Sequence, residues 1–243
     1  MTISAAIIII GNEILSGRTA DTNINFIAKN LTEVGIQLKE VRIIPDLREQ
    51  IITVVRELSL LYNYVFTTGG IGPTHDDITS EAVSAAFNQK YALNPEAYEM
   101  LKAGYASKGE DLNFAREKMA YMPANATLID NHISAAPGFI IENVYVLPGV
   151  PYIMQDMFIK LIPTLQHGQK VLSKALNLMI GESFIAREFE ALQNDYPTVE
   201  MGSYPFLAGE KHATSLVLRS DDHQALEESY SKLNILFDQI EKA

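Results

Sequence analysis

The sequence predicts a doubly wound α/β domain with a mostly parallel sheet, followed by a small α+β domain. Three observations lead to this prediction. The chain opens on a continuous β-branched run, strand-like and helix-like segments then alternate, and a polar, turn-prone segment interrupts the alternation at residues 166–169. We therefore expect one domain over residues 1–167 and a second over residues 168–243.

The first expected strand, Ala5–Ile10, consists of six apolar residues without polar alternation. Such a run is typical of a strand covered on both faces of a parallel sheet, so we expect it at the centre. After a loop over residues 11–20, Asp21 can cap a helix that ends at Gly35. Strand and helix together make the first half of a βαβ unit.

The same order then repeats. A strand over residues 36–44 precedes a helix marked by apolar residues between Leu47 and Leu58, and residues 64–68 form the next strand. Right-handed crossovers place the three strands parallel in one sheet, with helices on both faces. A helix after Asp77 continues the pattern.

The rest of the first domain is expected to hold a polar, mostly helical excursion from Asn94-Pro95, a hairpin over residues 139–147 and a helix from Pro151. In the second domain we expect an apolar strand, a helix from about Ser183, a strand containing Leu216–Leu218 and a final amphipathic helix.

Charge and cysteine content exclude several classes of function. Nineteen Lys and Arg residues stand against 30 Asp and Glu residues, which leaves a net charge of −11. Such a surface repels nucleic acids and anionic membranes, so we expect a small-molecule ligand instead. The absence of Cys excludes disulfides and thiolate chemistry and fits a cytoplasmic protein. The initial apolar run has six residues, far below the roughly 20 residues of a membrane helix.

Two loops rich in glycine and carboxylates follow the first and the third expected strands. They are Gly11–Gly17 and Gly69–Asp77. In open parallel sheets, ligands bind beyond the carboxyl ends of the strands, at the place where the strand order reverses. These two strands are expected to flank that place, so topology and composition predict the same site.

The second loop carries the strongest chemical signal. Gly69, Gly70 and Gly72 allow positive φ angles and let backbone N–H groups approach a phosphate at the start of the following helix. Asp76 and Asp77 would repel that phosphate unless a hard cation such as Mg²⁺ lies between, so the loop predicts a metal-bridged nucleotide. In the alternative interpretation the glycines only form a turn and Asp77 only caps the helix.

Other polar residues allow more than one interpretation each. Glu13 either assists the metal, or acts as a general base, or is merely solvated. Asp21 and Asn23 cap the helix, face the ligand, or do both. His75 is an exposed residue or a secondary proton shuttle. The sequence contains no serine triad, catalytic zinc motif, Walker loop or GxGxxG fingerprint, so metal-assisted phosphate chemistry remains.

Five motifs together resemble the CinA family. They are Gly-Asn-Glu-Ile-Leu-Ser-Gly at 11–17, Asp-Thr-Asn at 21–23, the glycine loop continued to Thr79, Ala-Pro-Gly-Phe at 136–139 and Leu-Pro-Gly-Val-Pro at 147–151. Residues 3–165 resemble a MoaB/Mog-type, molybdopterin-binding-like domain. The part with Ile180–Ser183 and Gly202–Pro205 resembles the small KH-like domain of the same proteins, without the GxxG clamp that grips nucleic acids.

The resemblance implies a metal-dependent pyrophosphatase for ADP-ribose and similar dinucleotides, with Mg²⁺, Mn²⁺, Co²⁺ or Ni²⁺ and with K⁺ as a further candidate cation. The alternatives are molybdopterin binding or adenylylation, as in Mog proteins, and a nucleotide-binding module without catalysis. A homo-oligomer is expected, a dimer rather than a trimer. The C-terminal amidase domain of longer CinA proteins is not expected here.

The expected catalytic residues are Asp76, Asp77 and Glu13, and the two aspartates are the expected metal ligands. The expected phosphate- and nucleotide-binding residues come from the two loops, from the start of the helix after Asp21 and from residues 134–138, which form the rim of the expected site. They are Gly11, Asn12, Asp21, Asn23, Thr68, Gly69, Gly70, Gly72, Pro73, Thr74, Ser134, Pro137 and Gly138. In the rim, Ser134-Ala135 stands where the family has Gly-Thr, a departure that bears on substrate choice.

Overall fold

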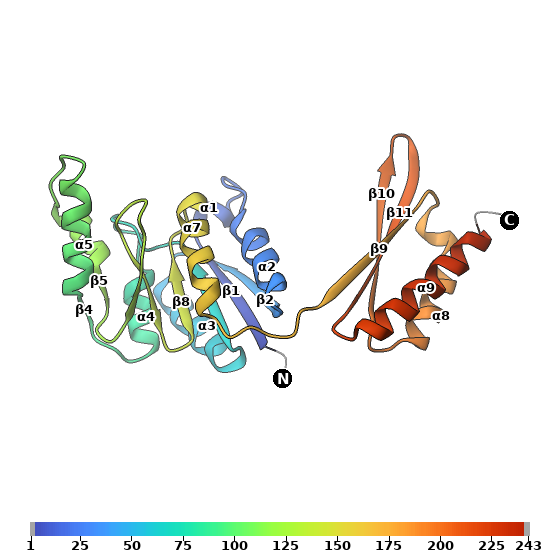
Figure 1. Cartoon of the computed structure of the whole chain (residues 1–243). Helices are drawn as coiled ribbons and strands as arrows, with labels where there is room; N and C mark the ends of the chain where they lie inside the picture. Colours follow the sequence, from blue (N-terminus) through green and yellow to red (C-terminus); the bar gives the residue numbers. More distant parts are fainter. Residues whose placement is uncertain (1–2, 241–243) are drawn as a thin grey trace. The chain divides into compact units, whose positions relative to one another are not determined.

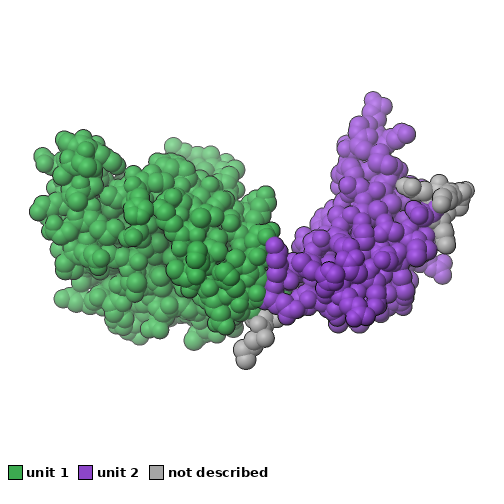
Figure 2. All heavy atoms as spheres, in the orientation of Figure 1, with its two compact units in different colours: residues 1–168 green, residues 169–243 purple. Residues whose placement is uncertain are grey.

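The computed structural model describes residues 3–240 and divides the chain into two compact units, residues 1–168 and 169–243 (Figure 2). The first unit ends after Gly168, one residue beyond the expected boundary. Its buried side chains form two clusters and those of the second unit form another, so each unit has a core of its own.

The first unit is the predicted doubly wound α/β domain. Its six-stranded sheet has the order β2-β1-β3-β8-β7-β6. The first four of these strands run parallel, and β7 and β6 add an antiparallel edge. The strands span Ile3–Ile10 (β1), Ile36–Ile44 (β2), Tyr64–Thr68 (β3), Thr127–Ile129 (β6), Gly138–Ile141 (β7) and Val144–Leu147 (β8).

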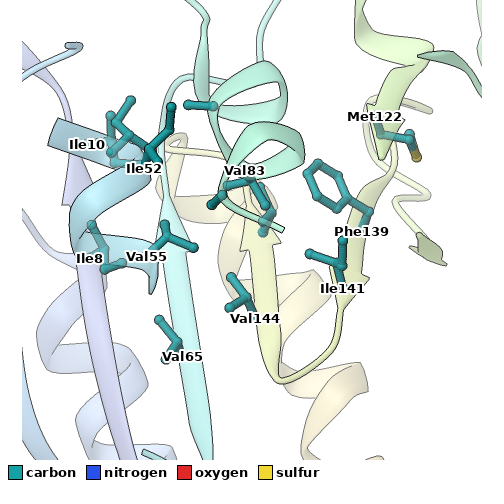
Figure 3. Close-up of a cluster of buried hydrophobic side chains, with 14 of the residues drawn as sticks. Ile8, Ile10, Ile52, Val55, Val65, Val83, Met122, Phe139, Ile141 and Val144 are labelled. Carbon is teal, nitrogen blue, oxygen red and sulfur yellow. The ribbon is translucent and has the colours of Figure 1, made fainter. Parts of the chain in front are cut away.

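Helices cover both faces of this sheet, which explains the unbroken apolar run of β1. Ile7 and Ile9 pack into a core with α2 (Asn23–Glu33) and α7 (Pro151–Leu161). Ile8 and Ile10 point the other way, into a core with α3 (Arg48–Leu61) and α4 (Thr79–Ala86) (Figure 3). Because successive side chains of a strand alternate between faces, a strand with two covered faces has apolar residues throughout.

An excursion follows α4 and returns to the sheet at β6 (Figure 1). The Asn94 side chain caps its main helix, as predicted, by accepting hydrogen bonds from the amides of Glu96 and Ala97. The short strands β4, β5 and β6 were not predicted, because three residues are too few to show a period. The excursion comprises β4 (Tyr91–Leu93), α5 (Pro95–Ala106), α6 (Phe114–Glu117), η1 (Lys118–Ala120) and β5 (Tyr121–Pro123).

The second unit is a small α+β domain, as predicted. Its three antiparallel strands have the order β10-β11-β9, and α8 and α9 pack on them through a shared apolar cluster. Its elements are β9 (Leu172–Leu178), η3 (Glu182–Phe184), α8 (Ala186–Asp195), β10 (Glu200–Ala208), β11 (Lys211–Ser220) and α9 (His223–Ile240). The last element of the first unit is the 3₁₀ helix η2 (Ile162–Thr164). Within residues 3–240, no helix has the length and apolarity needed to cross a membrane.

Two buried threonines give a matched test of the first core. Thr67 is fully buried, and its hydroxyl has no hydrogen-bond partner among the described residues. Since an unsatisfied buried hydroxyl is destabilising, we expect Thr67→Val to raise the free energy of unfolding by about 1 kcal/mol. Thr79 is equally buried but donates to the carbonyl of Gly69, so Thr79→Val should lower it. Urea denaturation measures both, and a loss of stability in Thr67→Val would contradict the prediction.

Arg42 links β2 to α3 and makes stability depend on pH. Its guanidinium donates to both Glu57 carboxylate oxygens at 2.7 and 2.8 Å and to Glu40 at 2.6 Å. These bonds lower the pKa of both carboxyls, and the Tyr62 hydroxyl lowers that of Glu40 further. A lowered folded-state pKa stabilises the fold above the unfolded pKa, and this contribution disappears as pH falls through the folded value.

We therefore expect Arg42→Met to lower the melting temperature at pH 7 and the gap to the unmodified protein to close as the pH falls below the ordinary carboxyl value of 4.5. Thermal melts between pH 3 and 8 measure this gap. Arg48→Met is the control, because Arg48 also pairs with two glutamates, Glu49 and Glu81, but its own side chain is 46% exposed against 26% for Arg42. A gap of constant size across this range would refute the assignment.

Candidate functional site

The candidate site lies at the carboxyl ends of β1, β3 and β8. The chain leaves β1 towards β2 on one side and then crosses to β3 on the other, so the strand order reverses between β1 and β3, as predicted. The segments that follow β1, β3 and β8 therefore meet at one edge of the sheet (Figure 1).

Glycines bring these three segments into direct contact. Gly69 has a φ of +103°, and a Cβ atom there would lie 2.1 Å from the carbonyl oxygen of Ile10 at the end of β1. On the other side, a Cβ atom on Gly149, which follows β8, would lie 3.3 Å from the Gly69 Cα atom. Thr68 is buried at the end of β3 directly before this contact. The loop thus needs glycine for packing as well as for any ligand.

Thr79, at the start of α4, holds the glycine loop in place. Its hydroxyl donates to the Gly69 carbonyl at 3.0 Å, and its amide donates to the Gly70 carbonyl at 2.9 Å. A Cβ atom on Gly70, whose φ is +68°, would lie 2.2 Å from the Thr79 hydroxyl oxygen. Thr79 was not among the expected site residues. Its place in the motif gave no sign that the side chain turns back to the loop.

The two aspartates differ in their surroundings. The Asp77 carboxylate accepts from the Thr74 amide at 2.7 Å and from the Thr74 hydroxyl at 2.5 Å. Its side chain caps no helix, because α4 begins at Thr79 without a side-chain cap. Asp77 therefore folds back over its own loop, close enough to Gly72 that a Cβ atom there would lie 2.7 Å from Asp77 Oδ2.

Asp76 is exposed to solvent. The Thr74 hydroxyl and the backbone amide of Asp76 lower the pKa of its carboxyl, with smaller contributions from His75 and Lys118. The His75 ring is 98% exposed, and its Nδ1 atom lies 3.9 Å from Asp76 Oδ1. Pro73 is also exposed. The outer half of the loop thus presents the Asp76 carboxylate to solvent, while the half-buried Asp77 carboxylate is held against Thr74.

These carboxylates fit a cation that is shared with a ligand. Among residues 3–240 no cluster of three or more His, Cys, Asp or Glu side chains has metal-binding geometry. A cage made by the protein alone is therefore not preformed there. Mg²⁺ typically takes one or two carboxylates and completes its shell with substrate phosphates and water, and Asp76 and Asp77 supply such a pair of hard oxygen donors.

The first expected loop contains the short helix α1 (Asn12–Leu15), where no helix was predicted. Its Glu13 is exposed, and the carboxylate turns back over Gly11, where a Cβ atom would lie 2.5 Å from Glu13 Oε1. The Asn12 amide donates to Asp46 Oδ2 at 2.9 Å. Asp46, which follows β2, is a further carboxylate at this edge that the sequence analysis did not select.

Asp21 and Asn23 differ in what their side chains contact. Asp21 Oδ1 accepts from the Ile24 amide at 2.8 Å and thus caps the start of α2. Asn23 is only 3% exposed, and its Nδ2 donates to the Gly149 carbonyl at 3.0 Å. Its Oδ1 atom is buried without a partner among the described residues. A buried acceptor without a partner next to Gly149 is unusual and calls for an explanation.

The rim loop lies farther along the same edge. The buried Asn131 organises it: the amide donates to the Ser134 hydroxyl and the Ala136 carbonyl and accepts from the amides of Ile133 and Ser134. Pro137 is buried. Gly138, at the start of β7, lies two strands from β3, about 10 Å at the usual strand spacing.

Packing explains why position 138 is a glycine, because a Cβ atom there would lie 2.4 Å from the Val146 carbonyl oxygen.

The departure from the family pattern at Ser134-Ala135 has an unexpected consequence. Ala135, with a φ of +66°, adopts the left-handed conformation, and Ser134 does not. The loss of glycine at position 134 therefore strains no backbone, and the strain lies one residue later.

Lys118 brings a positive charge to the glycine loop. Its Nζ atom donates to the Thr74 carbonyl. Among the hydrogen bonds of the described residues, this is the one contact of a Lys or Arg side chain with residues 69–77. The sequence analysis missed Lys118, because 44 residues separate it from Thr74 and no motif marks it.

Known proteins match both units. Residues 6–167 match the family model of a probable molybdopterin-binding domain, MoCF_biosynth. A protein of Archaeoglobus fulgidus is 39% identical over 199 residues, 82% of this chain and 84% of that protein. A CinA-like protein of Chloroherpeton thalassium is 35% identical over 196 residues but matches along only 47% of its own length, so this chain spans about half of it.

Among solved structures, the protein CinA of Thermoplasma acidophilum, described as having unknown function, aligns with a TM-score of 0.61 and 33% identity over 66% of this chain and 96% of that one.

The prediction of a KH-like second domain was wrong. Residues 170–241 match the middle domain of FAD synthase and not a KH-like domain. Both are small α+β folds, and the two short motifs behind the prediction do not distinguish them.

Proposed function

Because this chain belongs to the CinA family and carries a MoaB/Mog-type first domain, we propose that it is a metal-dependent pyrophosphatase acting on ADP-ribose or a related dinucleotide. One observation carries the proposal: a glycine cradle and two adjacent carboxylates, Asp76 and Asp77, share a single loop at the switch point of the sheet. This combination suits a pyrophosphate that is bound together with a cation.

Each part of the loop has a distinct task in this proposal. The backbone amides around Gly70 and Gly72 bind phosphate oxygens. Thr79 donates hydrogen bonds to the carbonyls of Gly69 and Gly70 and so keeps these carbonyls away from the phosphate. Asp76 and Asp77 would hold the divalent cation, with K⁺ as a further cation to be tested. When bound, such a cation neutralises phosphate charge and lowers the pKa of coordinated water. Glu13 is the candidate acceptor for the proton of that water.

The buried Asn23 supports a ligand with hydrogen-bond donors. Its free Oδ1 atom accepts one more hydrogen bond, and a ribose hydroxyl supplies one. The amide is held by the Gly149 carbonyl, so the acceptor is fixed before the ligand arrives. A bare phosphate has no such donor when fully ionised, which favours a nucleotide over an inorganic anion.

The test is the release of AMP from ADP-ribose, FAD and related dinucleotides with Mg²⁺, Mn²⁺, Co²⁺ or Ni²⁺, in the presence and absence of K⁺. We expect AMP release that requires one of the divalent ions and stops when EDTA is added in excess. If no dinucleotide is cleaved with any of these ions, the pyrophosphatase proposal fails.

The family description, a probable molybdopterin-binding domain, favours a second candidate, molybdopterin binding. We propose adenylylation of the pterin as the reaction that would accompany it. In this case the loop holds ATP and Mg²⁺, and the rim loop around Ser134 contacts the pterin. Tight molybdopterin binding together with ATP-dependent adenylylation would distinguish it. Thermal stabilisation by nucleotide without any turnover would instead indicate a binding module that lacks catalysis.

We also propose that the protein acts in the cytoplasm as a homo-oligomer, a dimer in preference to a trimer. The lack of Cys suits a reducing compartment. Light scattering on the purified protein measures the mass, and a monomer at micromolar concentration would contradict this part of the proposal.

A further inference from the structure

The excursion carries a short helical run, Phe114–Ala120, formed by α6 and η1. Phe114 and Lys118 are four residues apart, so their side chains share one face of this run. Lys118 reaches the Thr74 carbonyl in the glycine loop. Phe114 therefore lies on the same side of this run as the side chain that reaches the glycine loop.

Arg116 fixes this run from another side. Its guanidinium lies 4.2 Å from the centre of the Tyr105 ring, donates to the Asp111 carbonyl at 2.7 Å and pairs with Glu110. The Asn113 side chain caps the run by accepting from the Arg116 amide at 3.0 Å. The support of Phe114 is thus ordered by several contacts before any ligand binds.

The Phe114 ring itself is left uncovered. At 92% exposure it is the most exposed large apolar side chain of the described residues. A single exposed apolar residue is ordinary on a protein surface, so exposure alone carries no argument. The argument comes from its place: the ring shares a face with the cation that contacts the glycine loop.

We infer that Phe114 is the platform on which the base of a nucleotide ligand stacks, while Lys118 contacts the phosphates of the same ligand. The inference rests on the proposed function and adds to it the recognition of an aromatic base. A nucleotide base that stacks on an exposed aromatic side chain is stabilised without base-specific hydrogen bonds. The Lys118 ammonium has three N–H donors and uses one on the Thr74 carbonyl, so the others can bind phosphate oxygens. Ligands without a base would then bind through Lys118 and the glycine loop alone.

The absence of Trp from the chain provides a direct test. Phe114→Trp introduces a single tryptophan, whose fluorescence we expect AMP to quench in a saturable manner and ribose 5-phosphate to leave unchanged. Leu60→Trp is the control, since Leu60 is 87% exposed but lies near the end of α3, just before the amino end of β3 and thus at the opposite edge of the sheet, and neither ligand should quench it. Quenching of Phe114→Trp by neither ligand, or equally by both, would overturn the inference.

Affinity measurements complete the test. We expect Phe114→Ala to weaken AMP binding by about 5- to 150-fold and to leave ribose 5-phosphate binding unchanged. Lys118→Gln should weaken both ligands. An equal loss for both ligands in Phe114→Ala would indicate a merely structural role. AMP binding without hydrolysis of any dinucleotide overturns the proposed function alone, whereas hydrolysis of a dinucleotide without any binding of AMP overturns this inference alone.

Discussion

Asp77→Asn is expected to reduce metal-dependent AMP release from ADP-ribose on the order of 100-fold or more. Loss of a residue that only supports a metal ligand already costs roughly 10- to 100-fold, and Asp77 is proposed as a ligand itself. The substitution keeps the shape of the side chain and an oxygen that accepts from the Thr74 amide and hydroxyl. It removes the negative charge that a divalent cation requires. Steady-state assays with the best metal from the panel measure the effect.

Asp76→Asn is expected to act in the same direction, because Asp76 is the second hard oxygen donor on the loop. Asp156→Asn serves as the matched control: Asp156 lies on α7, where it pairs with Lys160 at 2.6 Å on the surface. Thermal melts establish that all three variants fold. Full activity in both Asp76→Asn and Asp77→Asn would remove the metal assignment from this loop.

Gly69→Ala is expected to destabilise the first unit by about 2 to 5 kcal/mol. The left-handed conformation costs a non-glycine residue roughly 1–2 kcal/mol, and forcing an extra carbon into a packed site adds about 1–3 kcal/mol. At Gly69 the two effects coincide, because φ is +103° and the new Cβ atom would lie 2.1 Å from the Ile10 carbonyl oxygen. The variant should also lose stabilisation by nucleotide.

Gly17→Ala separates the two effects. Gly17 also has a positive φ, +71°, but a Cβ atom there has no neighbour within 4 Å. We expect this variant to lose only the conformational part, roughly 1–2 kcal/mol. Urea denaturation of both variants provides the comparison. If the two losses are equal, the close approach of Gly69 to β1 does not contribute to stability.

The sequence by itself determined the architecture of the first unit. The unbroken run of Ala5–Ile10 identified a strand covered on both faces, and Asn94-Pro95 identified the start of a helix, because both signals are local. The glycines and carboxylates of the two loops predicted a ligand site at one edge of the sheet, and the strand order brings both loops to that edge. Local periods and turn residues carry this information, and a family resemblance supported it.

Tertiary structure decided which side chains build the site around those loops. Thr79 turns back to brace Gly69, Lys118 arrives from an excursion 44 residues farther along, and Asn23 meets Gly149 across 126 residues. No period or motif connects such pairs, since their contact depends on how distant elements pack. For the same reason the short strands β4, β5 and β6 and the type of the second domain were settled only by the folded chain and its relatives.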